Sequence, residues 1–456
     1  MAKKRRTRFI CSNCGWETSQ WLGNCGSCGQ WNTLEEVVIP DESGQKSHKS
    51  RLRSHGTDAV KPYSLDEIPV SEADRLQIGM GELDRVLGGG LMPGSFVLLG
   101  GDPGIGKSTL ALQCASMLTG QKTLYVSGEE SLAQIRQRAH RLDIHAKHLR
   151  MYTETEIMQI IETVRSEKPG VLIIDSIQTV YHSALQSMPG TTAQIRECAA
   201  LLMQLAKQEK VTVIGIGHVT KDGDLAGPRI LEHMVDTVLQ FEGDKQSHHR
   251  ILRTLKNRFG PAQEVGVFEM DNGGLREVSN PSELFLSEFD PSVSGNAVVC
   301  SMEGTRPLLI EIQALVTPTS YGMPQRTASG FDHRRLSLLL AVLEKRCGWQ
   351  FSQHDVFLNV AGGMKLTETA CDLGVASALV SSLSGKAAME PVVMIGEVGL
   401  GAEVRRVTQL VRRLEEAQAM GFSHAVVPQG YTEDSNILKV SAVRNIDDAL
   451  KKSGLI

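Results

Sequence analysis

The chain has 456 residues, of which 41% are hydrophobic and 22% charged, so its composition is that of a globular protein with about three domains. The net charge of −4 argues against a wholly basic nucleic-acid coat protein. No apolar run approaches the ~18 residues needed to span a bilayer and no hydrophobic stretch follows the basic N-terminus, so we expect a cytosolic protein that does not contact membranes.

Residues 1–35 combine a basic arm with a small cysteine module. The arm either contacts nucleic acid or is a solvated tail, and it is formed by Lys3, Lys4, Arg5, Arg6 and Arg8. Two Cys-x-x-Cys-Gly units follow, and each makes a tight turn that aims two thiolates at one point. Together they predict a tetrahedral structural Zn²⁺ site whose four ligands are Cys11, Cys14, Cys25 and Cys28.

The metal would supply the folding free energy of this module, because so short a segment cannot bury a sufficient core. A redox dithiol is the weaker alternative. The module also contains Trp16, Trp21 and Trp31, which we expect to pack there or dock on a neighbouring domain rather than stack on bases. Residues 36–61 are rich in Ser, His and charge without periodicity, and we expect a linker.

Between residues 62 and 275 predicted strands and helices alternate, which indicates a parallel sheet covered on both faces. An apolar strand over 95–100 precedes the loop and a helix over 110–118 follows it, as a G-x-x-x-x-G-K-[ST] phosphate loop requires. We therefore predict ATP binding, with Lys107 on the β- and γ-phosphates and Ser108 on Mg²⁺. The loop residues are Gly101, Asp102, Pro103, Gly104, Ile105, Gly106, Lys107, Ser108 and Thr109.

Three polar residues end strands of this sheet, where the active groups of such a fold lie. Asp175 ends the apolar run 171–175 and is predicted to steady Mg²⁺. Glu129 is the candidate that orients or deprotonates the attacking water, and the adjacent Glu130 stays its rival. His218 is predicted to sense the γ-phosphate or, alternatively, to cap its strand.

Two segments that follow these strands, 181–191 and 219–229, are rich in Gly, Pro and polar residues. We expect mobile loops that contact a polymer threaded past the sheet edge. The second loop contains Lys221 and Arg229.

Residues 80–94, Met-Gly-Glu-Leu-Asp-Arg-Val-Leu-Gly-Gly-Gly-Leu-Met-Pro-Gly, together with the phosphate loop, resemble the opening of a RecA-type ATPase. The string Lys256-Asn257-Arg258-Phe259-Gly260 resembles the signature of the bacterial RadA (Sms) family, which also has an N-terminal four-cysteine module. The resemblance covers essentially the whole chain. It implies a DNA-stimulated ATPase that binds single-stranded and branched DNA, acts with a RecA-type recombinase in branch migration, and works as a homo-hexamer.

Lys256 and Arg258 alternate along a predicted strand and so point to the same side. Two cations held together suit a finger that offsets charge on the ATP of a neighbouring subunit. The alternative is a solvated strand edge.

Residues 286–456 form a further α/β unit. Its run 366–381, Leu-Thr-Glu-Thr-Ala-Cys-Asp-Leu-Gly-Val-Ala-Ser-Ala-Leu-Val-Ser, resembles the nucleophile region of the proteolytic domain of Lon, and 396–401, Gly-Glu-Val-Gly-Leu-Gly, resembles a later turn of that domain. In this alignment the nucleophilic serine falls on Ala370 and the general-base lysine on Val411, and neither side chain can perform that chemistry. We therefore expect no peptidase activity. Arginine pairs either bind duplex backbone or, more favoured, form solvated helix faces: Arg334 and Arg335, Arg405 and Arg406, and Arg412 and Arg413.

An ATP-driven signalling or clock-type ring that does not act on nucleic acid is the alternative function. Such a ring shares the same core and paired glutamates. The zinc module and the Lys-Asn-Arg-Phe-Gly string speak against it.

Overall fold

The computed structural model describes residues 7–11, 17–26, 29–31, 33–38, 64, 75–217, 230–243, 249–319, 322–431 and 438–456. Cys14, Cys28, His218, the loop 219–229 and most of the predicted linker lie outside the described residues. Over the described part of the chain, no helix is both long and apolar enough to cross a membrane.

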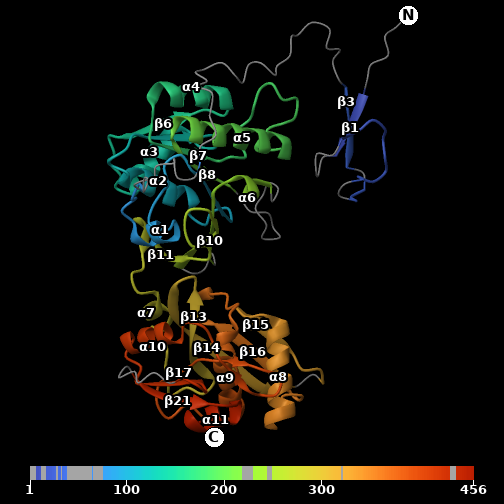
Figure 1. Ribbon diagram of the computed structural model, residues 1–456, viewed down its shortest axis with the longest axis vertical. Coiled ribbons are helices and arrows are strands. Elements are labelled where there is room, and N and C mark those ends of the chain that lie inside the picture. The colour runs from blue at the N-terminus through green and yellow to red at the C-terminus, as the bar shows by residue number, and fades with distance from the viewer. Residues whose placement is uncertain are drawn as a thin grey trace, which may run out of the picture.

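Figure 1 shows a larger lobe that contains the predicted phosphate loop, joined through a narrow waist to a second lobe that holds the C-terminus. The N-terminal residues add a small three-stranded antiparallel sheet of order β2-β1-β3. Its strands are β1 (Thr7–Cys11), β2 (Glu17–Thr18) and β3 (Leu34–Val38).

The larger lobe is built on a nine-stranded sheet of order β12-β11-β10-β9-β4-β8-β7-β5-β6. The six strands from β9 to β6 in this order are parallel, and the three from β12 to β10 are antiparallel. The strands are β4 (Phe96–Gly101), β5 (Thr123–Ser127), β6 (Leu149–Thr153), β7 (Val171–Asp175), β8 (Thr212–Ile216), β9 (Thr237–Glu242), β10 (His249–Asn257), β11 (Val265–Asp271) and β12 (Gly274–Glu277).

Helices cover both faces of the sheet, which explains why its central strands read as continuous apolar runs. Alternate residues of β4 enter different cores: Val97 and Leu99 face one, Phe96 and Leu98 the other. The helices are α1 (Gly81–Val86), α2 (Lys107–Met117), α3 (Leu132–Arg141), α4 (Ile157–Glu167), α5 (Thr192–Glu209) and α6 (Ile230–Met234). The predicted parallel sheet with two covered faces is confirmed for the six strands from β9 to β6, whereas β10, β11 and β12 extend it in antiparallel directions.

The second lobe contains a seven-stranded mixed sheet of order β15-β16-β14-β13-β17-β20-β21 and a two-stranded ribbon, β18-β19. Its strands are β13 (Asn296–Glu303), β14 (Arg306–Pro318), β15 (Arg326–Ser329), β16 (His354–Val360), β17 (Val392–Met394), β18 (Glu397–Val398), β19 (Val404–Arg405), β20 (His424–Pro428) and β21 (Lys439–Val443). Its helices are α7 (Pro281–Phe285), α8 (His333–Cys347), α9 (Asp372–Ser384), α10 (Leu410–Ala419) and α11 (Ile446–Lys452), with short 3₁₀ turns at Ala361–Gly363 and Thr369–Cys371.

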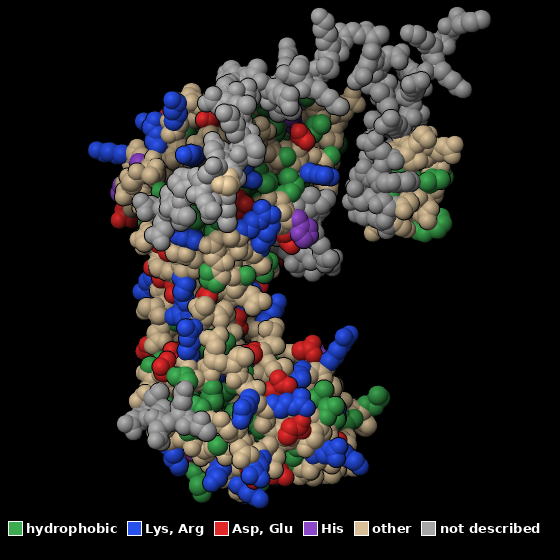
Figure 2. All heavy atoms as spheres, viewed as in Figure 1, with side chains coloured by type: hydrophobic (Ala, Val, Ile, Leu, Met, Phe, Trp, Pro, Cys, Tyr) green, Lys and Arg blue, Asp and Glu red, His purple; other side chains and the backbone are tan. Residues whose placement is uncertain are grey.

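The apolar core of the second lobe extends across the waist. Ile251, Val265 and Val267, from β10 and β11, belong to the same buried cluster as Leu308 and Ile310 of β14. Figure 2 shows Lys and Arg side chains beside Asp and Glu side chains on the surface of this waist. The domain boundaries 62–275 and 286–456 remain a prediction, but the two lobes are packed against one another and not merely tethered.

Candidate active site

The phosphate loop lies between the end of β4 and the start of α2, and its backbone requires glycine. Gly106 has φ of 115°, and a Cβ there would lie 2.5 Å from Cε of Met270. At Gly101, with φ of 153°, a Cβ would lie 2.6 Å from the carbonyl oxygen of Phe241. The close packing behind the loop therefore excludes larger residues, and it leaves the concave side to the backbone.

The remaining loop residues take the positions that the motif predicts. Ile105 is buried beneath the loop, and the turn formed by Asp102, Pro103 and Gly104 is exposed. Lys107, Ser108 and Thr109 form the first turn of α2, where backbone N–H groups have no partner within the helix and attract anions. The geometry fits a triphosphate, and the Mg²⁺ role of Ser108 stays a prediction.

Lys107 is almost fully buried, with 4% of its surface exposed. Its ammonium donates to the carbonyl oxygens of Gly101 (2.8 Å) and Asp102 (2.9 Å). Burial lowers the pKa of Lys107, and the nearby carboxylates of Asp175, Asp102 and Glu129 oppose the shift. Lys107 thus rests on neutral carbonyls that a phosphate can replace.

Asp175 ends β7 beside the phosphate loop, as predicted, and a buried tyrosine fixes its position. The hydroxyl of Tyr125 in β5 donates to Oδ2 of Asp175 at 2.6 Å. Burial raises the pKa of Tyr125 well above its usual range, and the charge of Asp175 adds to that shift. Tyr125 therefore stays a hydrogen-bond donor and holds the carboxylate next to the loop, where it fits a Mg²⁺ role.

The structure distinguishes the two adjacent glutamates that follow β5. Glu130 forms an ion pair with Arg138 of α3. Glu129 instead turns toward the end of β7, where the hydroxyl of Ser176 donates to its Oε1 at 2.5 Å. Glu129 is therefore the glutamate that lies beside Asp175 and Lys107, and an open cavity adjoins both glutamates.

Two residues of this site were not predicted from the sequence. One is Tyr125, which reads as an ordinary strand residue. The other is Arg250 of β10, whose Nε donates to the carbonyl oxygen of Ile105 at 3.2 Å and so braces the phosphate loop from behind. No local pattern marks either residue, because the partner of each is remote in the sequence.

Lys256 and Arg258 lie at the amino end of the parallel strands, whereas the phosphate loop of their own chain lies at the carboxyl end. The backbone N–H of Arg258 bonds to Asp236, whose own N–H bonds to Phe96, the first residue of β4. The loop follows the last residue of this six-residue strand, so about 17 Å of strand separates the two levels.

Both cations reach toward the end of α6. The ammonium of Lys256 donates to the carbonyl oxygens of Glu232 (2.7 Å), His233 (3.2 Å) and Val235 (2.8 Å). Burial lowers the pKa of Lys256, and the charge of Arg258 adds to the effect. The Arg258 side chain is 50% exposed and lies 3.5 Å from Asp236. The two side chains do point to the same side, and Arg258 is the more accessible.

In the N-terminal module the structure describes two of the four predicted zinc ligands. Cys11 and Cys25 are both buried and belong to one small cluster with Leu34. The two Cys-x-x-Cys units thus bring a thiol each to the same place, which fits a shared metal ion. The other two predicted ligands, Cys14 and Cys28, lie outside the described residues.

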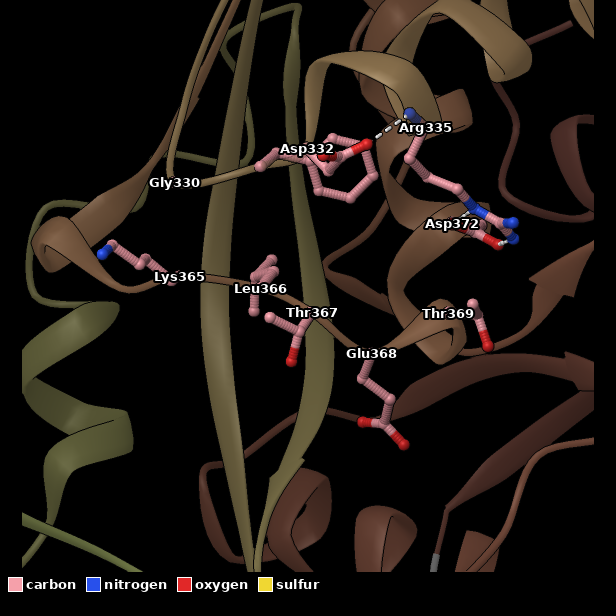
Figure 3. Close-up of a pocket in the computed structure, with 10 residues that line it drawn as sticks. Gly330, Asp332, Arg335, Lys365, Leu366, Thr367, Glu368, Thr369 and Asp372 are labelled. Carbon is pink, nitrogen blue, oxygen red and sulfur yellow. Dashed lines mark hydrogen bonds and ion pairs between the residues drawn. The ribbon is translucent and has the colours of Figure 1, made fainter. Parts of the chain in front are cut away.

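The second lobe has a cavity of about 510 Å³, and its wall includes Thr369 and Asp372, on either side of Ala370 in the sequence. Figure 3 shows Arg335 and Asp372 side by side at one end of the lining residues, with Lys365 at the other end. Arg335 forms an ion pair with Asp372, and burial raises the pKa of the Asp372 carboxyl although Arg335 opposes the shift. Glu368, also on the cavity wall, is paired with Arg413.

These contacts bear on the arginine pairs that the sequence singled out. Arg413 is fully buried, and it donates to the carbonyl oxygen of Cys300 at 2.5 Å as well as to Glu368. Arg335 is held by Asp372, and Arg405 by Glu403 at 2.6 Å. Neither duplex binding nor a solvated helix face therefore describes Arg413, because tertiary contacts occupy its whole guanidinium group.

Known protein families match three parts of the chain. Residues 9–36 match a rubredoxin metal binding domain, residues 61–224 an AAA domain, and residues 318–431 subunit ChlI of Mg-chelatase. These matches support ATP with Mg²⁺ and zinc as the ligands. The expected fold class is confirmed: a RecA-like P-loop ATPase core, a zinc ribbon and a Lon-like C-terminal domain.

Whole-length relatives are also found. The chain is 49% identical over 463 residues to "DNA repair protein RadA" of Brucella abortus (strain 2308), with 99% of each chain covered. It is 47% identical over 457 residues to proteins of the same name from Bacillus subtilis (strain 168) and Halalkalibacterium halodurans, again with 99% of each chain covered. A solved RadB recombinase, 24% identical, covers 45% of this chain and all of its own at a TM-score of 0.37, too low to bear on function.

Proposed function

This chain belongs to the RadA family of bacterial DNA repair proteins, and on that basis we propose that its ATPase activity is stimulated by single-stranded DNA. We propose further that it acts on recombination intermediates and drives branch migration of the products that a RecA-type recombinase makes. The observation that carries this proposal is the separation, within one subunit, of the phosphate loop from the Lys256 and Arg258 pair by the full length of β4.

In the phosphate site each described residue has one role. The backbone of 101–109 and the Lys107 ammonium bind the triphosphate, and Lys107 exchanges its two carbonyl partners for phosphate oxygens. Ser108 and Asp175 would hold Mg²⁺, which neutralises charge on the phosphates when it is bound. Glu129 orients the attacking water and accepts its proton, and Tyr125 keeps Asp175 in place. For His218 we retain the γ-phosphate sensor as a prediction.

The position of Arg258 supports a role in trans. It lies at the amino end of the parallel strands, whereas its own triphosphate would bind at their carboxyl end. A half-exposed guanidinium at that edge cannot reach its own ATP but can serve the next subunit of a ring. Lys256 would have to leave its three carbonyl partners to join Arg258 there. We propose a homo-hexamer in which the ATP sites lie between subunits.

Single-stranded DNA would contact the loops that follow the parallel strands. The loop 181–191 is braced at its base by Gln194, which is 1% exposed and bonds to His182 and Ser187. Met188 is 76% exposed at its tip. A loop that is held at its base and exposed at its tip can transmit contact with single-stranded DNA to α5. The exposed Trp21 and Trp31 of the zinc module are our candidates for docking a recombinase.

The test is the rate of ATP hydrolysis with and without single-stranded DNA, with Lys107→Ala as the blank. We expect DNA to raise the rate at least severalfold and the blank to stay inactive in both conditions. A rate that ignores DNA would contradict the proposed mechanism, and autophosphorylation without DNA binding would favour a signalling ring instead.

We also propose that the second lobe has no peptidase activity. The two dyad positions carry Ala370 and Val411, and the charged pairs beside them, Glu368 with Arg413 and Arg335 with Asp372, are engaged with one another. Incubation with casein should release no peptides, and Ala370→Gly should change nothing. Casein degradation that Ala370→Gly abolishes would overturn this proposal.

A further inference from the structure

The six-residue helix α1 connects the second lobe to the turn that carries Arg258. At its first turn lies Glu82, whose two carboxylate oxygens each accept a hydrogen bond from Arg306, at 3.0 Å in both cases. Arg306 is the first residue of β14 and also donates to the carbonyl oxygen of Ser279 at 2.9 Å. One guanidinium nitrogen, Nη1, reaches both oxygens of Glu82 and the other, Nη2, reaches Ser279. This ion pair joins the two lobes, and the Glu82 and Arg306 side chains are only 10% and 19% exposed.

The C-terminal end of α1 contacts the turn at residues 256–260 that carries Arg258, which we call the finger turn. The carbonyl oxygen of Val86 accepts from the hydroxyl of Thr254 at 2.7 Å, and that of Leu87 accepts from Nδ2 of Asn257 at 3.1 Å. Oδ1 of Asn257 in turn accepts from the N–H of Phe259 at 3.0 Å, which shapes the turn around Arg258. The last turn of α1 is therefore the seat of the Lys-Asn-Arg-Phe-Gly segment.

A glycine contact tightens this seat. A Cβ on Gly88, which has φ of 78°, would lie 3.2 Å from Cα of Gly260. The backbone after α1 and the backbone after Arg258 thus touch with no side chain between them. A shift of α1 has to move the finger turn with it, because both attachments are short and one is backbone against backbone.

We propose that Arg306, through Glu82 and helix α1, is a positioning residue for ATP hydrolysis in the neighbouring subunit. It fixes the position of Arg258 at the amino end of the parallel strands. This inference rests on the proposed role of Arg258 in trans. The second lobe thereby supports catalysis without contacting ATP.

We expect the protein to stay folded when Arg306 is removed from the joint, that is, from the Glu82–Arg306 contact between the lobes. The Glu82 carboxylate keeps two further partners, Arg85 and the N–H of Val267 at 2.9 Å, and the backbone N–H of Glu82 donates to Oε1 of Glu277 at 2.5 Å. Removing Arg306 therefore leaves the buried carboxylate paired but frees the helix from the second lobe. Arg306→Lys gives a second variant, because a lysine keeps the charge but has no second nitrogen to donate to Ser279 while the first contacts Glu82.

The experiment mixes subunits in equal amounts and measures ATP hydrolysis. Alone, Arg306→Ala should lower the rate about tenfold, since small displacements of a positioned group cost that much or more. Lys107→Ala is inactive alone but retains an intact finger and joint. In mixed rings it can lend its Arg258 to the phosphate loop of an Arg306→Ala neighbour, so the rate per Arg306→Ala subunit should rise about fivefold.

The outcomes separate the two claims. Recovery with both Arg258→Ala and Arg306→Ala partners supports the proposal. Recovery with Arg258→Ala but not with Arg306→Ala overturns it, because Arg306 then acts only on its own subunit. If neither mixture recovers, the finger does not act in trans and the proposed function fails with the inference.

Arg276→Ala is the matched control. Arg276 lies close by on β12, is 73% exposed and pairs only with Glu269 among the described residues. Its replacement should leave both the rate and the mixing behaviour unchanged. Arg306→Lys should fall between the wild type and Arg306→Ala, and a lysine variant with the full wild-type rate would contradict the need for the second contact, to Ser279.

Discussion

Two buried cations, one in each lobe, have opposite surroundings. Lys107 of the phosphate loop is 4% exposed and donates to two neutral carbonyl oxygens. Arg413 of the second lobe is fully buried and is paired directly with the carboxylate of Glu368. The carboxylates near Lys107 are held by hydroxyl groups instead, Asp175 by Tyr125 and Glu129 by Ser176.

The difference shows how a site for chemistry differs from a structural joint made of the same residue types. Around the phosphate loop, neutral groups hold Lys107, Asp175 and Glu129 in place, so these charges remain directed at the space where a substrate binds. In the second lobe the charges neutralise one another, and what they contribute is attachment between α10, β13 and the turn before α9. A cavity is present in both places, so a cavity alone does not indicate catalysis.

The largest expected effect is on the phosphate loop. Lys107→Ala should reduce ATP hydrolysis to background, a fall of more than about 100-fold, because the triphosphate loses its main buried cation. Thermal unfolding should change little, since only two carbonyl contacts are lost. Lys122→Ala is the control: its ammonium is exposed and lies 3.6 Å from Glu167. Hydrolysis that survives in Lys107→Ala would break the comparison.

Next come the paired glutamates. Glu129→Gln should lower kcat by about 10²–10⁴ with little change in KM, because the amide cannot accept a proton from water. Glu130→Gln should cost less than about tenfold, through the loss of the Arg138 pair. Steady-state kinetics of both variants decide the matter. The reverse order of effects would assign the base to Glu130.

In the second lobe the corresponding change should affect stability and not chemistry. Arg413→Ala should lower the free energy of unfolding by about 3–5 kcal/mol, because Glu368 is left without its partner. Denaturant titration measures this loss, and the rate of hydrolysis per folded molecule should stay that of the wild type. The double variant Glu368→Gln with Arg413→Met should recover much of the stability. A stable Arg413→Ala protein would show that this pair is not a structural joint.

The smallest effect is expected at the residue that holds Asp175. Tyr125→Phe removes one hydrogen bond to Asp175. The Mg²⁺ concentration that gives half-maximal hydrolysis should rise about tenfold, because a residue that orients a metal ligand is lost. Tyr152→Phe on the neighbouring strand β6 is the control. An unchanged Mg²⁺ titration for Tyr125→Phe would mean that Asp175 needs no such support.

The sequence by itself determined those features whose signal lies within one short segment of the chain. The phosphate loop, the run 171–175 and the apolar strands and helices of the larger lobe were predictable because their signals lie within a few residues. The same holds for Ala370 and Val411, whose chemistry follows from residue type alone. The choice between Glu129 and Glu130 was not predictable, because adjacent residues carry the same local signal.

Only the tertiary structure decided which remote groups meet. Tyr125 reaches Asp175, Arg250 braces Ile105, and Arg306 clasps Glu82, each across dozens of residues or more. The tertiary structure also placed Arg258 at the end of the strands opposite its own phosphate loop, because β10 runs antiparallel to β9. The physical reason is common to all four: local patterns fix how a segment folds, whereas the order and direction of strands fix which segments touch.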